Sequence, residues 1–354
     1  MDVIEKIVIV IPTLDPDDRL IELLQNLKRR GFYKIVLVND GSGIEYDRYF
    51  EIAEKQLGCI VLKHAVNLGK GRALKDAFNF ILSSYENIVG VITADSDGQH
   101  TVDCIEKCGI ALMENPDSLI LGVRNFDDNN VPWKSDLGNK ITRKVCNFIC
   151  GIDVSDTQTG LRGISKDFMR ELLSVSGERF EFETQMLIAT KNFCKIKEIP
   201  IKTIYDSKKN HSSHFDPIKD SLKIYKIFGT IFFKYIFSSL SSSVIDLLLF
   251  AIFSNLLVGW KTLYYITYAT IFSRIISSLY NYIINYKFVF FSKKGKRVAG
   301  AYYFILVIIQ MILSALLVTV GVQIFNFLPI MIVKISVDTI LFFLSYHVQQ
   351  RYIF

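Results

Sequence analysis

The chain has 354 residues, enough for two domains, of which 50% are hydrophobic and 21% are charged. This composition excludes a disordered protein or one built mainly to bind nucleic acid, and the net charge of +6 is concentrated beside hydrophobic segments. Residues 1–227 have the composition of a soluble α/β protein, whereas residues 228–354 are dominated by Ile, Leu, Phe, Val and Tyr. We therefore expect a soluble half followed by a membrane half.

In the soluble half, short β-rich runs alternate with segments of helical periodicity. The predicted strands are 6–11, 34–38, 59–63 and 88–93, and the predicted helices are 18–30, 44–57 and 70–84. This alternation predicts βαβ units on a mainly parallel sheet, the Rossmann-like α/β class. Ligands of such sheets bind beyond the carboxyl ends of the strands, so the residues there are the candidates for a site.

Polar residues follow the first three predicted strands. The first strand runs into Pro12-Thr13-Leu14-Asp15 and the second into Asn39-Asp40-Gly41-Ser42. Asp40 is well placed to bind a base or ribose, although this sequence is also a common turn. The third strand leads to a glycine-containing turn, residues 67–72, that opens a helix able to face a phosphate. The turn lacks the spacing of a P-loop and of GxGxxG, which disfavours kinases and dehydrogenases.

The fourth predicted strand is followed by Asp95-Ser96-Asp97-Gly98-Gln99-His100. Two carboxylates separated by one residue, with an amide oxygen two residues further on, can converge on one hard cation. Such a cation would neutralise charge on the leaving group of a nucleotide substrate. An Asp-rich turn and a calcium loop are the alternatives, but the glutamate that ends an EF-hand loop is missing.

Residues 137–150 have the pattern of an amphipathic helix. Leu137, Ile141 and Val145 share one face, while Lys140, Arg143 and Lys144 lie elsewhere. This helix either lies in the lipid headgroup region or packs in the core. A second segment, 215–227, alternates apolar residues with lysines and is predicted to join the two halves.

Four stretches of the second half approach the roughly 20 apolar residues that a membrane-spanning helix needs. They are residues 229–257, 262–285, 301–325 and 329–350. The middle connector, 287–297, carries five basic residues, which predicts that this loop and both termini face the cytoplasm. Ionisable residues inside the stretches are expected to pair, for example Asp246 with Arg274, or to snorkel near helix ends, as for Lys334.

The order of the motifs PTLD, VNDGS, NLGKGRAL and DSDGQH resembles the GT-A fold glycosyltransferases of family 2. The resemblance is to polyprenyl-phosphate sugar transferases such as dolichol-phosphate mannose synthase and bactoprenol glucosyltransferase. Further similarities are Gly122-Val123-Arg124 and the segments 155–163, 178–186 and 210–225, so the resemblance covers nearly all of residues 6–227. The second half resembles a GtrA-like four-helix membrane domain, through residues 281–290 and the terminal QQRYIF.

This resemblance implies a division into three parts: a GT-A glycosyltransferase domain over 1–214, an amphipathic joint over 215–228 and a transmembrane domain over 229–354. It implies that Mg²⁺ or Mn²⁺ is held by Asp95, Asp97 and Gln99, and that these act in catalysis together with Arg124. The nucleotide-binding residues that it implies are Pro12, Thr13, Leu14, Asp15, Asn39, Asp40, Lys70, Asp95 and Ser96. Two departures leave the donor open: Asn39 replaces an aspartate of many relatives, and Leu14-Asp15-Pro16 replaces the Tyr-Asn-Glu of mannose synthases.

The implied activity is that of an inverting, metal-dependent hexosyltransferase of the cytoplasmic membrane, with its catalytic domain in the cytoplasm. One sugar passes from a nucleotide-sugar, UDP-glucose first and UDP-GlcNAc or GDP-mannose as alternatives, to polyprenyl (undecaprenyl) phosphate. The product would be a lipid-linked sugar for cell-envelope glycosylation.

A phosphate acceptor simplifies the chemistry. The second pKa of a phosphate monoester is about 6, so the acceptor is largely a dianion at neutral pH and needs no strong base. It needs cations instead, for which Arg124 and the acceptor-phosphate set Lys140, Thr142 and Arg143 are candidates. Asp156, Gln158 and Arg162 are expected to organise the acceptor side, Asp156 by hydrogen bonding more than as a base.

Two rival functions can be compared with this one. A processive polysaccharide synthase would carry a QxxRW signature, and this sequence has none. A lipid-sugar translocase whose soluble half merely binds nucleotide is the second rival, because the hydrophobic stretches contain charges. The hydrophobic half could also assemble a homo-oligomer.

Overall fold

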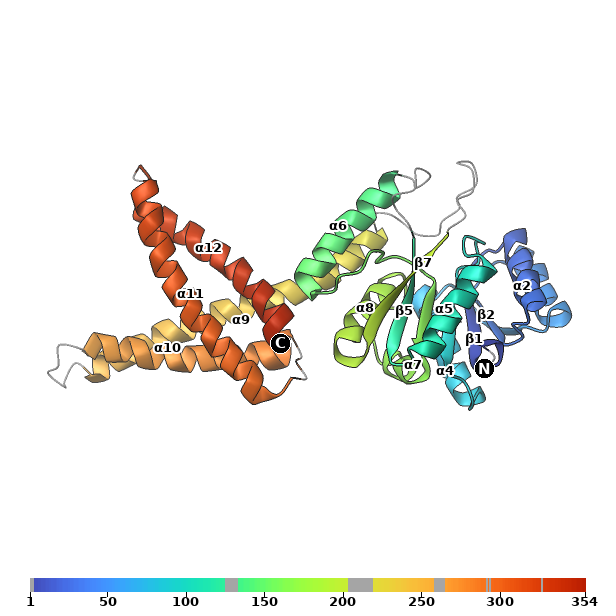
Figure 1. Cartoon of the computed structure of the whole chain (residues 1–354), viewed down its shortest axis with the longest axis horizontal. Coiled ribbons are helices and arrows are strands. Elements are labelled where there is room, and N and C mark those ends of the chain that lie inside the picture. The colour runs from blue at the N-terminus through green and yellow to red at the C-terminus, as the bar shows by residue number, and fades with distance from the viewer. Residues whose placement is uncertain are drawn as a thin grey trace. The chain divides into compact units, whose positions relative to one another are not determined.

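The computed structural model describes residues 3–124, 133–202, 219–257, 265–290, 292, 294–325 and 327–354. The chain divides into two compact units. We call the first, Met1–Asn147 with Ile152–Tyr225, the head, and the second, Phe148–Gly151 with Lys226–Phe354, the tail (Figure 1).

The head is built on a seven-stranded sheet with the order β3-β2-β1-β4-β6-β5-β7. The strands are β1 (Ile7–Thr13), β2 (Ile35–Asn39), β3 (Ile60–Lys63), β4 (Gly90–Thr93), β5 (Ser118–Arg124), β6 (Arg162–Ser165) and β7 (Lys195–Ile201). All pairings are parallel except those of β6, which runs antiparallel to both β4 and β5. The predicted mainly parallel sheet is thus confirmed, and its first four strands lie where the β-rich runs are.

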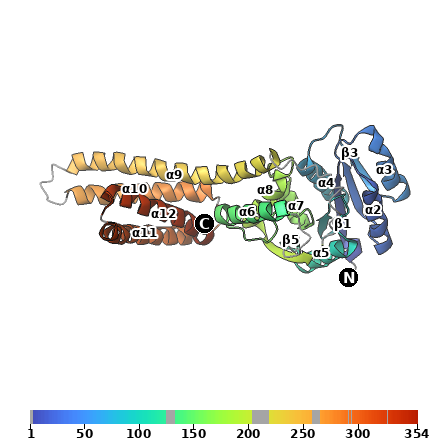
Figure 2. The same cartoon turned by 90° about the horizontal axis from the view of Figure 1, so that it is seen from above.

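Helices cover both faces of this sheet (Figure 2). In one core cluster, Ile7, Ile9 and Ile11 of β1 pack with apolar residues of α2 (Asp18–Arg30) and α5 (Val102–Glu114). The intervening residues of β1 point to the other face, because side chains alternate along a strand. That face is covered by α4 (Lys70–Ser84), which contacts β1 and β2.

The remaining helices of the head are shorter or reach its boundary. They are α1 (Val3–Lys6), α3 (Asp47–Glu51), α7 (Lys166–Leu172), α8 (Glu181–Phe193) and α6 (Trp133–Cys150), whose last residues belong to the tail. The predicted helix 44–57 is present in three pieces, because a 3₁₀ turn, η1 (Ile44–Tyr46), precedes α3 and a π-helical turn, η2 (Ile52–Gln56), follows it.

The described residues of the tail form four long helices. They are α9 (Lys219–Leu257), which begins in the head, α10 (Tyr265–Ile284), α11 (Lys296–Ile324) and α12 (Ile330–Val348), with π-helical turns η4 (Asn285–Val289) and η5 (Gln349–Ile353). Within the described residues, three segments are long and apolar enough to cross a membrane: Lys219–Leu257, Lys296–Ile324 and Ile332–Ile353. The described part of the predicted joint, 219–228, is continuous with the first predicted span in α9, and residues 215–218 lie outside the description.

Polar residues inside the tail are paired. Arg274 of α10 lies 3.4 Å from Asp246 of α9, which confirms the predicted pair, and Lys334 lies 2.9 Å from Asp338 one turn along α12. The buried amide of Asn285 accepts a hydrogen bond from Ser238 at 2.7 Å and donates to Asn281 and Gln349 at 2.9 Å each. These bonds connect α9, α10, η4 and η5, so a polar core helps to fix how the apolar helices pack.

Candidate active site

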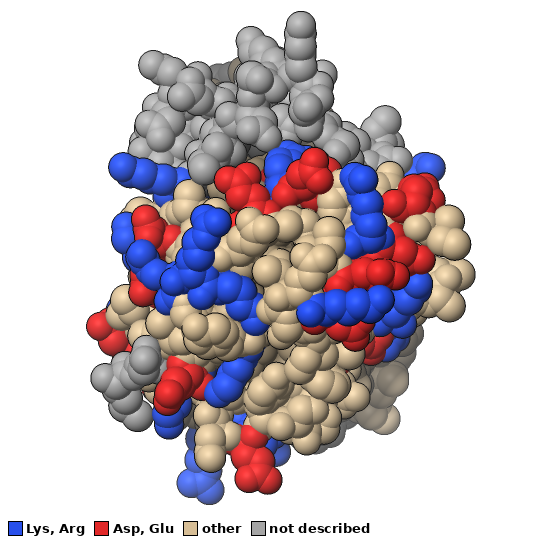
Figure 3. Space-filling model, turned by 90° about the vertical axis from the view of Figure 1, so that its right-hand side faces the viewer, with Lys and Arg blue, Asp and Glu red and all other residues tan. Residues whose placement is uncertain are grey.

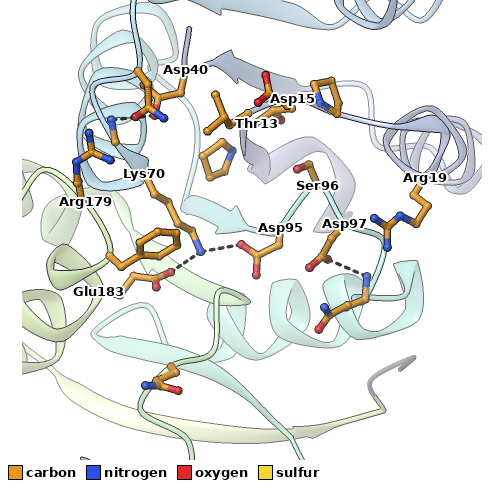
Figure 4. A pocket seen from close by; sticks show the side chains of 18 of the residues that line it. Thr13, Asp15, Arg19, Asp40, Lys70, Asp95, Ser96, Asp97, Arg179 and Glu183 are labelled. Carbon is orange, nitrogen blue, oxygen red and sulfur yellow. Dashed lines mark hydrogen bonds and ion pairs between the residues drawn. The ribbon is translucent and has the colours of Figure 1, made fainter. Parts of the chain in front are cut away.

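A cavity of about 480 Å³ opens at the carboxyl ends of β1, β2 and β4 (Figure 4). This is the position that the strand order predicts, because the parallel strands end there together. The sequence-predicted residues that line it are Pro12, Thr13, Leu14, Asp15, Asp40, Lys70, Asp95, Ser96, Asp97, Gln99, Arg124 and Gln158. The structure thus brings together most of the predicted donor-side residues, although they lie in separate motifs of the sequence.

The loop after β1 has a constrained backbone. Asp15 has a φ of 45°, in the left-handed region that few residues other than glycine adopt, and its backbone N–H donates to Ser42 Oγ at 2.9 Å. Asn39 does not line the cavity, and its Oδ1 accepts the backbone N–H of Ser42 at 2.8 Å. Asn39 therefore orders the loop that holds Asp15. Its side chain does not reach the cavity in which the nucleotide contact was predicted.

Asp40 reaches the cavity wall, but its carboxylate is occupied by the loop before α4. Oδ1 accepts the backbone N–H of Leu68 at 2.9 Å, and Oδ2 accepts that of Gly69 at 2.8 Å. The ring Nδ1 of His64 lies 2.8 Å from the same carboxylate. Asp40 thus orders the turn from which α4 begins. His64 had no predicted role, because nothing in its local sequence indicates this contact.

Lys70, the first residue of α4, places its ammonium between two carboxylates (Figure 4). Nζ lies 2.7 Å from Oδ1 of Asp95 and 2.8 Å from Oε1 of Glu183. Burial alone would lower the pKa of Lys70, but the charges of Asp95 and Glu183 outweigh it and hold that pKa above its usual value. The lysine is therefore a charged group at neutral pH, fixed at the wall of the cavity.

Asp95 and Asp97 differ in their surroundings. Burial opposes ionisation of Asp95, yet Lys70 and the nearby His100, whose Nε2 is 3.4 Å from Oδ2, hold its pKa below the usual range. The pKa of Asp97 is raised, first by burial and then by the negative charge of Asp95. Asp97 Oδ1 accepts the backbone N–H of Gln99 at 3.0 Å. The negative charge of Asp95 is thus balanced by Lys70, whereas Asp97 has no ion pair of this kind among the described residues.

The donor set at this wall fits a hard divalent cation. Within the described residues, no three His, Cys, Asp or Glu side chains form a ready-made metal cluster. Asp95, Asp97 and Gln99 nevertheless all line the same cavity, and carboxylate and amide oxygens are the ligands that Mg²⁺ and Mn²⁺ prefer. Burial and then the nearby charge of Asp95 raise the pKa of Asp97, and a divalent cation here would relieve the second of these two effects.

Arg124, which also lines the cavity, forms a two-pronged ion pair with Asp156. Its Nε and Nη2 lie 2.6 and 2.9 Å from the two carboxylate oxygens, and the side chain of Asp156 is fully buried. Gln158 lines the cavity, and its backbone N–H donates to Asp156 at 3.1 Å. Asp156 is thus the ion-pair partner of Arg124, and its predicted role on the acceptor side stays a prediction.

Arg162 is buried and does not line the cavity. Its guanidinium donates to the backbone oxygens of Thr159 at 2.9 Å and Glu183 at 2.7 Å. Burial lowers the pKa of Arg162 from its ordinary value. The residue ties β6 to α8 and so supports the wall that carries Glu183.

The predicted acceptor-phosphate residues lie on α6 and outside the cavity lining. Lys140 is exposed, the Thr142 hydroxyl donates to the backbone oxygen of Gly138 at 2.9 Å, and Arg143 Nε donates to that of Val154 at 2.9 Å. The structure does not bring these three side chains together with Asp95 and Asp97. Their role stays a prediction.

Several cavity residues were missed by reasoning from the sequence. Arg19, Arg179, Phe180, Glu183 and Thr184 line the cavity. Residues 178–186 resemble the family pattern, but the resemblance implies no role for any of their side chains. The sequence around Glu183, EFETQ, is mostly polar and gives no signal that this glutamate is buried. Its burial appears only in the fold, where a buried carboxylate needs a cationic partner.

One face of the head has no charge pattern typical of nucleic-acid binding. On the face shown in Figure 3, basic and acidic side chains are interspersed over the described residues. A groove that follows a nucleic-acid backbone would instead be lined by one sign of charge.

Comparisons with known proteins give consistent results. Residues 8–173 match the profile of Glycosyl transferase family 2. An uncharacterized protein of Methanocaldococcus jannaschii is 34% identical over 206 residues, which cover 57% of this chain and 82% of the relative. The UDP-N-acetylglucosamine–dolichyl-phosphate N-acetylglucosaminyltransferase of Methanococcus voltae is 27% identical over 221 residues, covering 56% of this chain and 86% of the relative. Among solved structures, glucosyl-3-phosphoglycerate synthase from Mycobacterium tuberculosis is 14% identical with a TM-score of 0.42, and the match covers 62% of this chain and 75% of that one.

Proposed function

This chain belongs to glycosyl transferase family 2, and from that membership we propose that it transfers one sugar from a nucleotide-sugar to a polyprenyl phosphate at a membrane surface. The observation that carries the proposal is one cavity lined by the carboxylates of Asp95 and Asp97 and by the cationic groups of Lys70 and Arg124. The same chain carries three apolar helical segments of membrane-spanning length. A site for two anionic substrates and a means of reaching a lipid are thus present together.

The proposed reaction is a single displacement with inversion. The bond between the anomeric carbon of the sugar and the β-phosphate oxygen breaks, and the nucleoside diphosphate leaves with the electron pair. A phosphate oxygen of the acceptor forms the new bond to the same carbon from the opposite side. Because that phosphate is largely a dianion at neutral pH, no side chain has to remove a proton.

The protein's task is then to hold two anions close together. Lys70 stands at the N-terminus of α4, where backbone N–H groups also favour a phosphate. Arg124 lines the same cavity and keeps its orientation through Asp156. Mg²⁺ or Mn²⁺ bound by Asp95, Asp97 and Gln99 would neutralise charge on the departing diphosphate.

The donor is proposed to be a UDP-sugar. The relative from Methanococcus voltae is named as a transferase of N-acetylglucosamine from UDP to dolichyl phosphate, which supports UDP-GlcNAc ahead of UDP-glucose and GDP-mannose. The same name supports a polyprenyl phosphate as acceptor, whether undecaprenyl or dolichyl.

We further propose that the head faces the cytoplasm and that the tail is a GtrA-like membrane domain, able to form a homo-oligomer. The basic residues at and just before the start of α11, Lys294, Lys296 and Arg297, support this orientation. A cysteine introduced at the exposed Lys296 should face the cytoplasm. A membrane-impermeant maleimide added to cells should therefore label it only after the membrane has been permeabilised. Labelling in intact cells would reverse the proposed topology.

One experiment tests the proposed reaction as a whole. The full chain in detergent is incubated with radiolabelled UDP-GlcNAc, UDP-glucose or GDP-mannose and with undecaprenyl or dolichyl phosphate. We expect one donor to give a chloroform-soluble product that carries a single sugar. Long glycan chains would indicate a processive synthase, and nucleotide binding without any lipid product would favour the translocase.

A further inference from the structure

We propose that Lys70 is an internal counter-ion that competes with the divalent cation for Asp95, that Glu183 positions it there, and that the donor's diphosphate draws it away. Metal and donor would then bind cooperatively. This inference rests on the proposed function, because it concerns the same cavity and the same two ligands. It gives a role to Glu183, which the sequence did not predict.

The geometry places the ammonium where it shields one carboxylate of the metal site. Lys70 Nζ lies 2.7 Å from Asp95 Oδ1 and 2.8 Å from Glu183 Oε1, and only 17% of the lysine side chain is exposed. The other oxygen of Asp95 faces His100 at 3.4 Å. A cation that approaches Asp95 therefore meets a fixed positive charge.

Two like charges at such a distance repel each other strongly where water is partly excluded. A divalent cation can use Asp95 fully only when the ammonium moves off. Lys70 can move because its long side chain is held by ion pairs and not by a covalent or backbone constraint, and because it lines the cavity that would hold the donor. The two negatively charged phosphate groups of a diphosphate can replace Asp95 as partners of the Lys70 ammonium.

Glu183 determines how firmly Lys70 is held. The side chain of Glu183 is 10% exposed. The buried Arg162 holds this part of α8 in place, because its guanidinium donates to the backbone oxygen of Glu183 at 2.7 Å. Without the charge of Glu183, the ammonium would have only Asp95 as a strong partner. It would then be freer to meet a diphosphate, while the metal would still have to displace it.

These statements predict opposite effects on two ligands measured separately. In Lys70→Met, Mn²⁺ should bind more tightly in the absence of nucleotide, and UDP should bind more weakly in the absence of metal, each by about fivefold or more, the lower end of typical coupling. In Glu183→Gln, UDP alone should bind more tightly and Mn²⁺ alone more weakly. A variant that merely damages the site would weaken both ligands.

The test uses the full chain in detergent, with Mn²⁺ binding followed by electron paramagnetic resonance and UDP binding by calorimetry in EDTA. Lys75→Met is the matched control, because Lys75 lies on the same helix, is also buried and pairs with Glu178 at 3.0 Å, yet does not line the cavity. Both affinities should be unchanged in this control. In the unmodified chain, UDP should strengthen Mn²⁺ binding, and Mn²⁺ should strengthen UDP binding by the same factor.

Two results would overturn the inference. If Lys70→Met weakens Mn²⁺ binding or leaves it unchanged while the unmodified chain binds Mn²⁺ with UDP, the counter-ion role is wrong and the proposed function stands. If the unmodified chain binds no Mn²⁺ even with UDP, the metal-dependent function fails and this inference fails with it.

Discussion

The carboxylate of Asp95 occupies the space that a side chain at Gly160 would need. A Cβ atom on Gly160 would come closer than 3.0 Å to both oxygens and to the carboxyl carbon of Asp95, a separation that real Cβ atoms essentially never show. The turn before β6 therefore approaches the cavity wall that carries Asp95 so closely that a Cβ atom at position 160 fits only if Asp95 moves.

Gly160→Ala should accordingly displace Asp95 and lower the rate of sugar transfer by about 100-fold, because small misplacements of catalytic groups have effects of that size. Initial rates with saturating donor and acceptor would measure this. Gly138→Ala is the control, since a Cβ there would meet nothing within 4 Å. Equal rates for the two variants would contradict the proposed importance of the position of Asp95.

The ion pair of Arg124 and Asp156 gives a second prediction. Arg124→Met leaves the fully buried carboxylate of Asp156 without its partner and should destabilise the head by about 3–5 kcal/mol, as measured by denaturant unfolding. The double variant Arg124→Met/Asp156→Leu should recover much of that stability, because no uncompensated charge remains. It should not recover sugar transfer, and an active double variant would show that Arg124 has only a structural role.

The polar core of the tail gives a third prediction. Asn285 makes three hydrogen bonds to other elements of the tail, and such bonds contribute about 0.6 kcal/mol each in membrane proteins. Asn285→Leu should therefore lower the thermal stability of the tail in detergent. Ser243→Ala should have no such effect, because the exposed hydroxyl of Ser243 bonds only within its own helix, to Ser239. A tail that is equally stable in both variants would count against a role for this network.

Much of the head could be predicted from local sequence. The runs of β-branched residues locate β1 to β4, and the polar residues that follow them do converge on one cavity, because parallel strands end at the same edge. The second half of the sheet was not predicted. β6 runs antiparallel between β4 and β5, and that arrangement depends on pairings between strands far apart in the sequence.

The same limitation applies to the site. The acidic motif is local and was found, whereas the contact of Lys70 with Glu183 joins the start of α4 to α8 and has no local signal. Asp40 was expected to face the nucleotide, but its oxygens are taken by backbone N–H groups whose position depends on the folded loop. Arg162 was expected near the acceptor and is instead enclosed beneath the cavity wall.

The central claim is that the carboxylates beyond β4 act with a divalent cation in transferring a sugar to a lipid phosphate. The most direct measurement compares the formation of radiolabelled lipid by the full chain with and without EDTA, and by Asp97→Asn with the exposed Asp103→Asn as control. We predict that EDTA and Asp97→Asn each abolish the lipid product, that added Mn²⁺ or Mg²⁺ restores it after EDTA, and that Asp103→Asn retains it. Undiminished product in EDTA, or from Asp97→Asn, would contradict the account.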